Sequence, residues 1–214
     1  MTLGQSSGRH STEQRHDHTA ALQDGLDFVN TLWQTKPAPR EDLTDLPAAV
    51  HWFDEHDLLH REMVTEQLER HVRDQDSSKP LLRRIRRVRA ALRELLDATV
   101  ERRPADPAAL REVNRALRTH YVYELVPAHD GVSLDHRHEG DPIDGALARL
   151  AESIARELTK PEAARLRICD NLDCRWVFYD TSPSGRRRWC DMSTCGNRAK
   201  VARHRARRRE QQPA

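Results

Sequence analysis

All four cysteines of this 214-residue chain fall within 27 residues, in two pairs of equal spacing. Cys169 and Cys174 are separated by four residues, as are Cys190 and Cys195, and fifteen residues lie between the pairs. Four thiolates carried by two short loops are a ligand set typical of a tetrahedral structural zinc site. The spacing therefore predicts a small module organised around one Zn²⁺ rather than around a large hydrophobic core.

Disulfide bonds are the competing interpretation, since four cysteines can pair in three ways. The chain begins with polar residues instead of a secretory signal segment, and its length is sufficient for an ordinary core. Zinc is therefore favoured, in a structural role, because four cysteines leave no open coordination position. No apolar run approaches the roughly 20 residues that cross a bilayer. We expect a cytoplasmic protein without a membrane partner.

The charge of the chain is divided between its two parts. From Arg165 onward there are 13 Lys/Arg and five Asp/Glu, a net charge of +8. The preceding 164 residues carry a net charge of −6, although the whole chain has a net charge of only +2. An acidic body followed by a basic end predicts that the basic end meets a polyanion.

Residues 1–19 are polar and predict a disordered lead-in, whereas residues 20–160 carry apolar side chains at helical spacing. We expect a mainly helical domain there. The predicted helices run from Ala20 to Trp33, from about Pro47, from Leu58 to about His71, from Leu81 to Val100, from Asp106-Pro107 and from Asp141-Pro142. The segment Asp76 to Pro80 is predicted to separate the third helix from the long fourth helix.

Two further features of the body have predictable structures. The arginines between Arg83 and Arg93 lie largely outside the apolar stripe of the long helix, so we expect a solvated face paired with acidic neighbours. The stretches 120–126 and 132–136 are rich in strand-forming residues. They predict one β-hairpin with a five-residue loop from Pro127 to Gly131.

The C-terminal module, residues 161–214, is predicted to contain a strand on each side of the first cysteine pair. These strands are Leu166 to Cys169 and Arg175 to Tyr179, and a basic helix follows Cys195. Two ligands from a strand turn and two from a loop that enters a helix describe a treble-clef-like arrangement. Cys195 is then expected in the first turn of the helix, where the amide dipoles stabilise a thiolate.

The basic residues of this module are candidates for contact with nucleic acid. Arg198, Arg205 and Arg209 share one stripe of the predicted helix, and apart from Val201 the helix has little to pack into a core. The candidate nucleic-acid-binding residues are Arg186, Arg187, Arg188, Asn197, Arg198, Lys200, Arg203, Arg205, Arg207, Arg208 and Arg209. The helix suits the major groove of DNA, whereas Trp176, Phe178 and Trp189 could instead stack on the bases of RNA.

The tetrapeptide Cys195-Gly196-Asn197-Arg198 resembles the signature of the CGNR zinc finger. The segment from Leu26 to Leu32 is similar to the opening of the ABATE domain, which accompanies this finger in bacterial proteins. The resemblance implies a family of candidate stress-induced transcription regulators. It also implies that Cys169, Cys174, Cys190 and Cys195 hold the zinc ion, without assigning individual roles to Asn197 and Arg198.

The expected function is that of a bacterial transcription regulator that binds DNA through the zinc module. The body is expected to receive a small-molecule effector or to form a homodimer. The alternative is a zinc-stabilised module that binds RNA or an acidic protein. No phosphate loop, nucleophile elbow or paired metal motif is found in the sequence, so we do not expect an enzyme.

Overall fold

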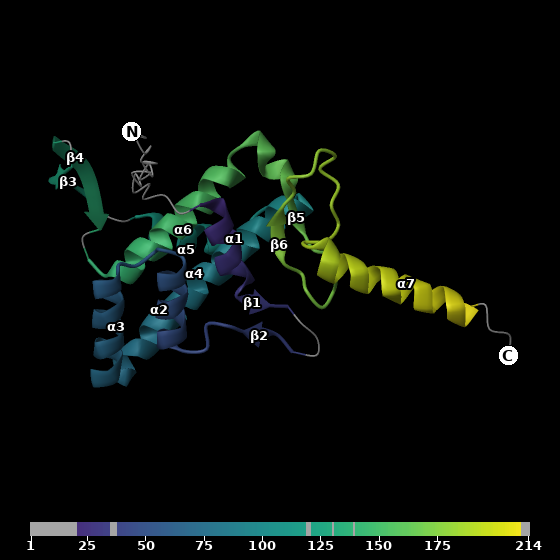
Figure 1. The fold of residues 1–214 in the computed structure, drawn as a ribbon, viewed down its shortest axis with the longest axis horizontal. Helices are drawn as coiled ribbons and strands as arrows, with labels where there is room; N and C mark the ends of the chain where they lie inside the picture. Colours follow the sequence, from purple (N-terminus) through teal and green to yellow (C-terminus); the bar gives the residue numbers. More distant parts are fainter. Residues whose placement is uncertain (1–20, 35–37, 119–120, 130, 139, 211–214) are drawn as a thin grey trace, which may run out of the picture.

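The computed structural model describes residues 21–34, 38–118, 121–129, 131–138 and 140–210, and these form a mainly helical body from which a basic helix projects (Figure 1). The α-helices are α1 (Leu22–Asn30), α2 (Leu46–Glu55), α3 (Arg61–Arg73), α4 (Gln75–Glu101), α5 (Pro107–Leu117), α6 (Pro142–Leu158) and α7 (Asn197–Glu210). The predicted fold class is confirmed. The predicted lead-in, residues 1–19, lies outside the described residues.

Helix α4 is the centre of the body, with α1, α2, α3, α5 and α6 packed around it. The apolar stripe that the sequence predicts for it is buried, as shown by Ile85, Leu92 and Leu96, each 0 % exposed. Helices α5 and α6 begin where the aspartate-proline pairs predict, and each aspartate caps its helix. The Asp106 carboxylate accepts the Ala108 N–H at 2.8 Å, and the Asp141 carboxylate accepts the Ile143 N–H at 2.9 Å.

The described strands form three antiparallel pairs. These are β1 (Leu32–Trp33) with β2 (Arg40–Glu41), β3 (Tyr121–Ala128) with β4 (Gly131–His138), and β5 (Leu166–Ile168) with β6 (Val177–Tyr179). The sequence predicted the second and third pairs and missed the first. Along the described parts of the chain, no helix is both long and apolar enough to cross a membrane.

The predicted extension of the first helix to Trp33 is wrong, because α1 ends at Asn30 and Trp33 lies in β1. The backbone of Trp33 pairs with Arg40, and its indole N–H donates to the Asp42 carboxylate at 2.6 Å. The Trp33 ring also packs edge-on against Trp176, with centroids 4.6 Å apart. Contacts with distant residues therefore override the helical spacing of the tryptophan.

The predicted break at Asp76 to Pro80 is also wrong, since α4 begins at Gln75 and the interruption lies at Asp74. Pro80 occurs in the second turn of α4 and removes one backbone hydrogen bond there. Helix α4 packs against α3. The buried Ser78 hydroxyl lies 2.7 Å from Nδ1 of His71, so the two helices are joined where the proline weakens α4.

Most arginines of α4 pair with carboxylates of neighbouring elements, as predicted. Arg84 pairs with Asp144, and Arg86 lies 3.4 Å from Glu41. Arg89 contradicts the prediction of a solvated face, because it is only 3 % exposed. Its guanidinium binds both carboxylate oxygens of Glu41, one of them at 2.6 Å, and fixes the β1–β2 pair to α4.

The β3–β4 hairpin lies at the opposite end of the molecule from α7 (Figure 1). Its predicted five-residue loop is wrong, because Pro127 and Ala128 continue β3 and Ala128 pairs with Gly131. The apolar side chains of Leu125, which is 70 % exposed, and Val132, which is 71 % exposed, do not join the core. The hairpin was therefore predictable from the strand propensity of its residues and not from a buried apolar face.

Gly25 allows α1 to approach α6 closely. A Cβ atom at this position would lie 2.7 Å from the Ser153 hydroxyl and 2.8 Å from Ile154 Cγ1, which are both buried. Gly25→Ala is expected to lower the free energy of unfolding by about 1–3 kcal/mol, because a tightly packed interface must shift. Urea unfolding measures this effect. Ala21→Gly at the exposed start of the segment serves as the control, and a change in stability as large as that of Gly25→Ala would contradict the prediction.

Candidate metal centre and nucleic-acid interface

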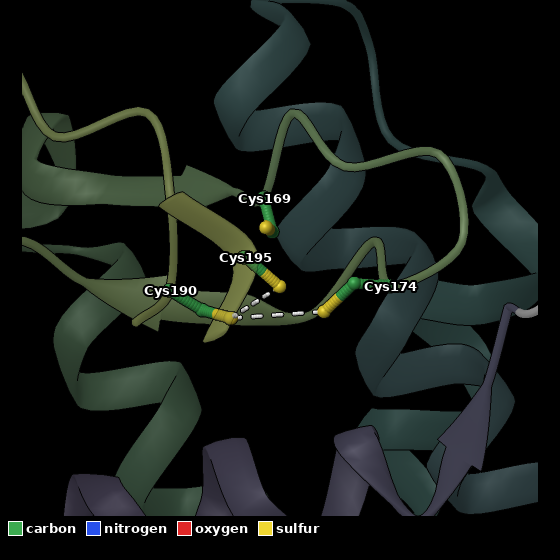
Figure 2. Close-up of side chains that lie close together, drawn as sticks. All are labelled: Cys169, Cys174, Cys190 and Cys195. Carbon is green, nitrogen blue, oxygen red and sulfur yellow. Dashed lines mark hydrogen bonds between the residues drawn. The ribbon is translucent and has the colours of Figure 1, made fainter. Parts of the chain in front are cut away.

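The four cysteines converge on one point although they come from two separate segments of the chain (Figure 2). Cys169 follows β5, Cys174 ends the turn before β6, and Cys190 precedes a single π-helical turn from Met192 to Gly196 that contains Cys195. Cys195 therefore lies in the π-helical turn, two residues before the start of α7, and not in the first turn of α7 as predicted. The order of elements is a cysteine turn within a hairpin, a loop, and a helix.

The sulfur positions fit a single tetrahedral ion. The Cys190 sulfur lies 3.6 Å from that of Cys174 and 3.8 Å from that of Cys195 (Figure 2). All four sulfurs lie within 4.8 Å of one another. Ligands that are each about 2.3 Å from a tetrahedral zinc ion would be about 3.8 Å apart. The cluster is thus already arranged for one structural Zn²⁺.

The cluster is also buried, which increases its need for a cation. Cys169, Cys174 and Cys195 are buried and Cys190 is half-buried. Hydrogen bonding with the Cys174 and Cys190 thiols lowers the pKa of Cys169 to about 2. Hydrogen bonding with Cys169 in turn raises the pKa of Cys174 to about 12 and raises that of Cys190 as well. One thiolate thus suppresses ionisation of its neighbours, and a divalent cation would allow all four to ionise together.

Two polar side chains shape the loops that carry the sulfurs. The side-chain oxygen of Asn171 accepts the Asp173 N–H at 3.1 Å, and its side-chain NH₂ group donates to the Cys195 sulfur at 3.4 Å. The Asp191 carboxylate accepts the Thr194 N–H at 2.7 Å and thereby caps the π-helical turn. Hydrogen bonds from Ser193 and Thr194 lower the pKa of Asp191, so this cap stays ionised at neutral pH.

Comparison with known families agrees with this geometry. Residues 25–161, more than half of the chain, match the ABATE model, described as "Putative stress-induced transcription regulator". The chain belongs to the ABATE family. Residues 165–208 of this ABATE protein match the CGNR zinc finger, so both predicted resemblances are confirmed in the predicted order. No curated protein matches the chain.

The CGNR finger of this ABATE protein packs against the body rather than hanging from it. Leu166, Ile168 and Val177 belong to the main core, whereas Phe178 and the cysteines form a second cluster with Trp176 and Trp189. Val177 and Phe178 therefore alternate between the two clusters, as successive residues of a strand do. The β5–β6 hairpin therefore links the zinc cluster to the helical core.

Asn30, at the end of α1, secures this contact. Its buried side-chain amide donates to the Val177 carbonyl and accepts the Val177 N–H, each at 2.9 Å. Nearby, Arg93 of α4 donates to the Arg175 carbonyl at 2.8 Å. The sequence gives no sign of this role, because Asn30 lies within the ABATE-like opening segment and its partner is 147 residues away.

Asn30→Ala is expected to lower the free energy of unfolding by about 2–4 kcal/mol, because it leaves both backbone groups of Val177 buried without a partner. Hydrogen exchange should show faster opening of β6 than of the centre of α4. Gln23→Ala, an exposed change on the same helix, is the control. Equal exchange at β6 in Asn30→Ala and the wild type would contradict the role assigned to Asn30.

The three consecutive arginines predicted to bind nucleic acid occupy different environments. Arg187 lies over the Phe178 ring at 5.2 Å and donates to the Cys190 carbonyl at 2.6 Å, so it supports the metal loops. Arg188 pairs with Asp170 at 2.6 Å but remains exposed. Arg186 is exposed, with no ion pair to any described residue. Only Arg186 and Arg188 are therefore open to a partner.

A buried carboxylate holds the loop that carries these arginines. Asp180 is 0 % exposed and accepts the N–H groups of Ser182 at 3.0 Å and Arg187 at 2.8 Å. Burial by itself would raise the pKa of Asp180, but these hydrogen bonds together lower it to about 2. An aspartate followed by Ser and Pro within two or three positions predicts a turn at Asp180, but the sequence does not predict that its carboxylate is buried and holds the arginine loop.

Helix α7 presents the remaining candidates and extends away from the body (Figure 1). The exposed cationic side chains are Arg198, Lys200, Arg203, Arg205 and Arg207. None of them pairs with a carboxylate of the described side chains. The Asn197 amide donates to the Ser193 carbonyl at 2.9 Å, so this residue joins α7 to the π-helical turn. The side chains of Arg208 and Arg209 lie outside the described residues.

Proposed function

We propose that this ABATE-family protein is a transcription regulator that binds duplex DNA through α7 of its CGNR finger. The observation that carries the proposal is the contrast between the two arginine-rich helices. The arginines of α4 mostly pair with carboxylates of the body, whereas the described cations of α7 have no such partners and project from the molecule. Unpaired cations in this density are suited to phosphates.

The surface of α7 also has a shape that supports nucleic-acid contact. A concave region of about 540 Å³ lies where the π-helical turn meets α7, lined by Thr194, Arg198, Val201 and Arg205 among others. Arg198 and Arg205 therefore share one face, as the helical spacing predicts. The two arginines beside this concave surface can contact the phosphate backbone of DNA, while the exposed length of α7 enters a groove of the duplex.

Duplex DNA is favoured over unpaired RNA because the aromatic rings of the finger are already engaged. Trp176 packs against Trp33 of the body, Phe178 is only 9 % exposed, and Trp189 is half-buried beside Arg188. Base stacking requires an accessible ring face. The described residues of the finger therefore provide a positively charged helix for nucleic acid, but no accessible aromatic ring on which a base could stack.

The proposal also covers the oligomeric state of the protein, the role of its metal and its location. One module makes few phosphate contacts and binds weakly, so we propose that the protein acts as a homodimer. Zinc is assigned a structural role, because the four sulfurs would fill its coordination sphere. We accordingly propose a cytoplasmic, non-enzymatic regulator.

A competition experiment tests the choice of partner. The zinc-loaded protein is bound to a labelled duplex DNA and challenged, at one salt concentration, with unlabelled duplex DNA, a structured RNA and heparin. We expect duplex DNA to compete best at equal phosphate concentration. Stronger competition by the structured RNA would favour the alternative of an RNA-binding module, and equal competition by all three would indicate charge attraction without recognition of the duplex.

A further inference from the structure

A second site lies in the ABATE body. A cavity of about 510 Å³ opens between α3 and the first turns of α4, and Leu46 of α2 and Asp141 before α6 complete its wall. This volume is in the range of pockets that hold small molecules. None of the residues that line the cavity belongs to the finger.

The cavity is strongly basic although the body as a whole is acidic. Four arginines line it, Arg70, Arg83, Arg84 and Arg87, while Asp141 is the single carboxylate of the lining. Three of these arginines have carboxylate partners. Arg84 pairs with Asp144, Arg70 pairs with Glu66 at 2.8 Å and lies 3.6 Å from Asp141, and Arg87 lies 3.7 Å from Glu112. The exposed Arg83 has no ion pair with any residue that the structure describes. Among the described residues, Arg83 is therefore the arginine of the lining whose charge is not matched by a carboxylate.

Gln67 supplies the observation that makes this surface a binding site. The side chain is 1 % exposed and lines the cavity, yet neither its Nε2 nor its Oε1 has a hydrogen-bond partner within the described chain. Buried amides are normally paired, and leaving one unpaired destabilises a protein. A side-chain amide presents one donor group and one acceptor next to each other. Its natural complement is a group with an adjacent acceptor and donor.

We propose that this cavity binds a small organic anion that carries a phosphate or carboxylate together with an amide or lactam edge. Guanidinium groups bind both kinds of anion with paired hydrogen bonds, which assigns the anionic group to the arginines. The amide or lactam edge pairs with Gln67. Leu46 and Leu81 contact the apolar part of the ligand. The inference does not depend on DNA binding by the finger.

Isothermal titration calorimetry on the full-length, zinc-loaded protein tests this site with three probes. Uridine monophosphate carries a phosphate and a lactam edge, orotate carries a carboxylate and a lactam edge, and inorganic phosphate has no such edge. We expect saturable binding of one molecule per chain for uridine monophosphate or orotate, at least tenfold tighter than for inorganic phosphate. The tighter of the two identifies the anionic group. The absence of saturable binding by both lactam probes would overturn the proposal.

Three variants separate binding from folding. Gln67→Leu removes the unpaired amide at similar volume, so it should weaken the lactam probes at least tenfold without lowering the melting temperature. Arg83→Ala should weaken all three probes. Arg73→Ala, on α3 but outside the cavity lining, is the matched control and should bind like the wild type. Unchanged affinity in Gln67→Leu, or an equal loss in Arg73→Ala and Arg83→Ala, would overturn the assignment.

Discussion

Cys169→Ser is expected to reduce the zinc content from one ion per chain to nearly none and to unfold the finger. The Cys169 side chain is fully buried among three other thiols, and the second core contains little besides the cysteines and three aromatic rings. Structural zinc contributes about 10–16 kcal/mol to the folding of small finger modules, far more than so small a core can supply. Nucleic-acid binding should be lost together with the metal.

Metal analysis and hydrogen exchange measure this effect. Amides from Cys169 to Cys195 should exchange rapidly in the variant, whereas the buried centre of α4 should remain protected, because its partners α1, α5 and α6 do not contain a ligand. Ser184→Ala, an exposed change in the loop of the same finger, should keep full zinc content. Stoichiometric zinc in Cys169→Ser, or protection of the finger after removal of zinc by a chelator, would contradict the assigned metal centre.

The double variant Arg198→Ala, Arg205→Ala is expected to weaken binding to duplex DNA by roughly 60-fold at about 0.1 M salt. Each phosphate contact makes the slope of log K against log salt concentration more negative by about 0.9. At about 0.1 M salt, the loss of one contact therefore lowers K by nearly tenfold. Both side chains line the same groove of α7 and lack carboxylate partners among the described residues. Fluorescence anisotropy gives the affinity, and circular dichroism shows whether the fold is intact.

The control for this variant removes the same charge from the body. Arg73 and Arg156 are exposed and pair with glutamates one turn away on their own helices. Arg73→Ala, Arg156→Ala should therefore change the affinity less than threefold, because exposed pairs contribute little. A similar loss of affinity in both double variants would show that total charge, and not α7, determines binding.

The metal centre could be predicted from the sequence because all its ligands lie close together along the chain. Four cysteines within 27 residues restrict the geometry to a few arrangements, and the two strands predicted beside the first cysteine pair are present. The helices with aspartate-proline caps were predictable for the same reason, since a cap depends on neighbours within one turn. Cys195 lies two residues before α7 and not in its first turn, because a π-helical turn precedes α7.

The features that the sequence did not predict all depend on distant partners. Trp33 leaves the helical pattern because Trp176, far along the chain, packs against it. In the sequence Arg89 cannot be distinguished from the other arginines of α4, because its burial depends on the ion pair with the distant Glu41. The basic cavity combines residues of three helices with Asp141 before α6, and the unpaired amide of Gln67 is evident only when burial is known. Local spacing contains none of this information.

The salt dependence of duplex DNA binding by the zinc-loaded protein tests the proposed function most directly. We expect log K to fall linearly with log salt concentration with a slope of about −4 to −5, as contact with about five phosphates requires. The five exposed cations of α7 described above can supply those contacts. A slope near zero, or no retention of DNA by the zinc-loaded protein at low salt, would contradict the proposal that α7 is a DNA-binding helix.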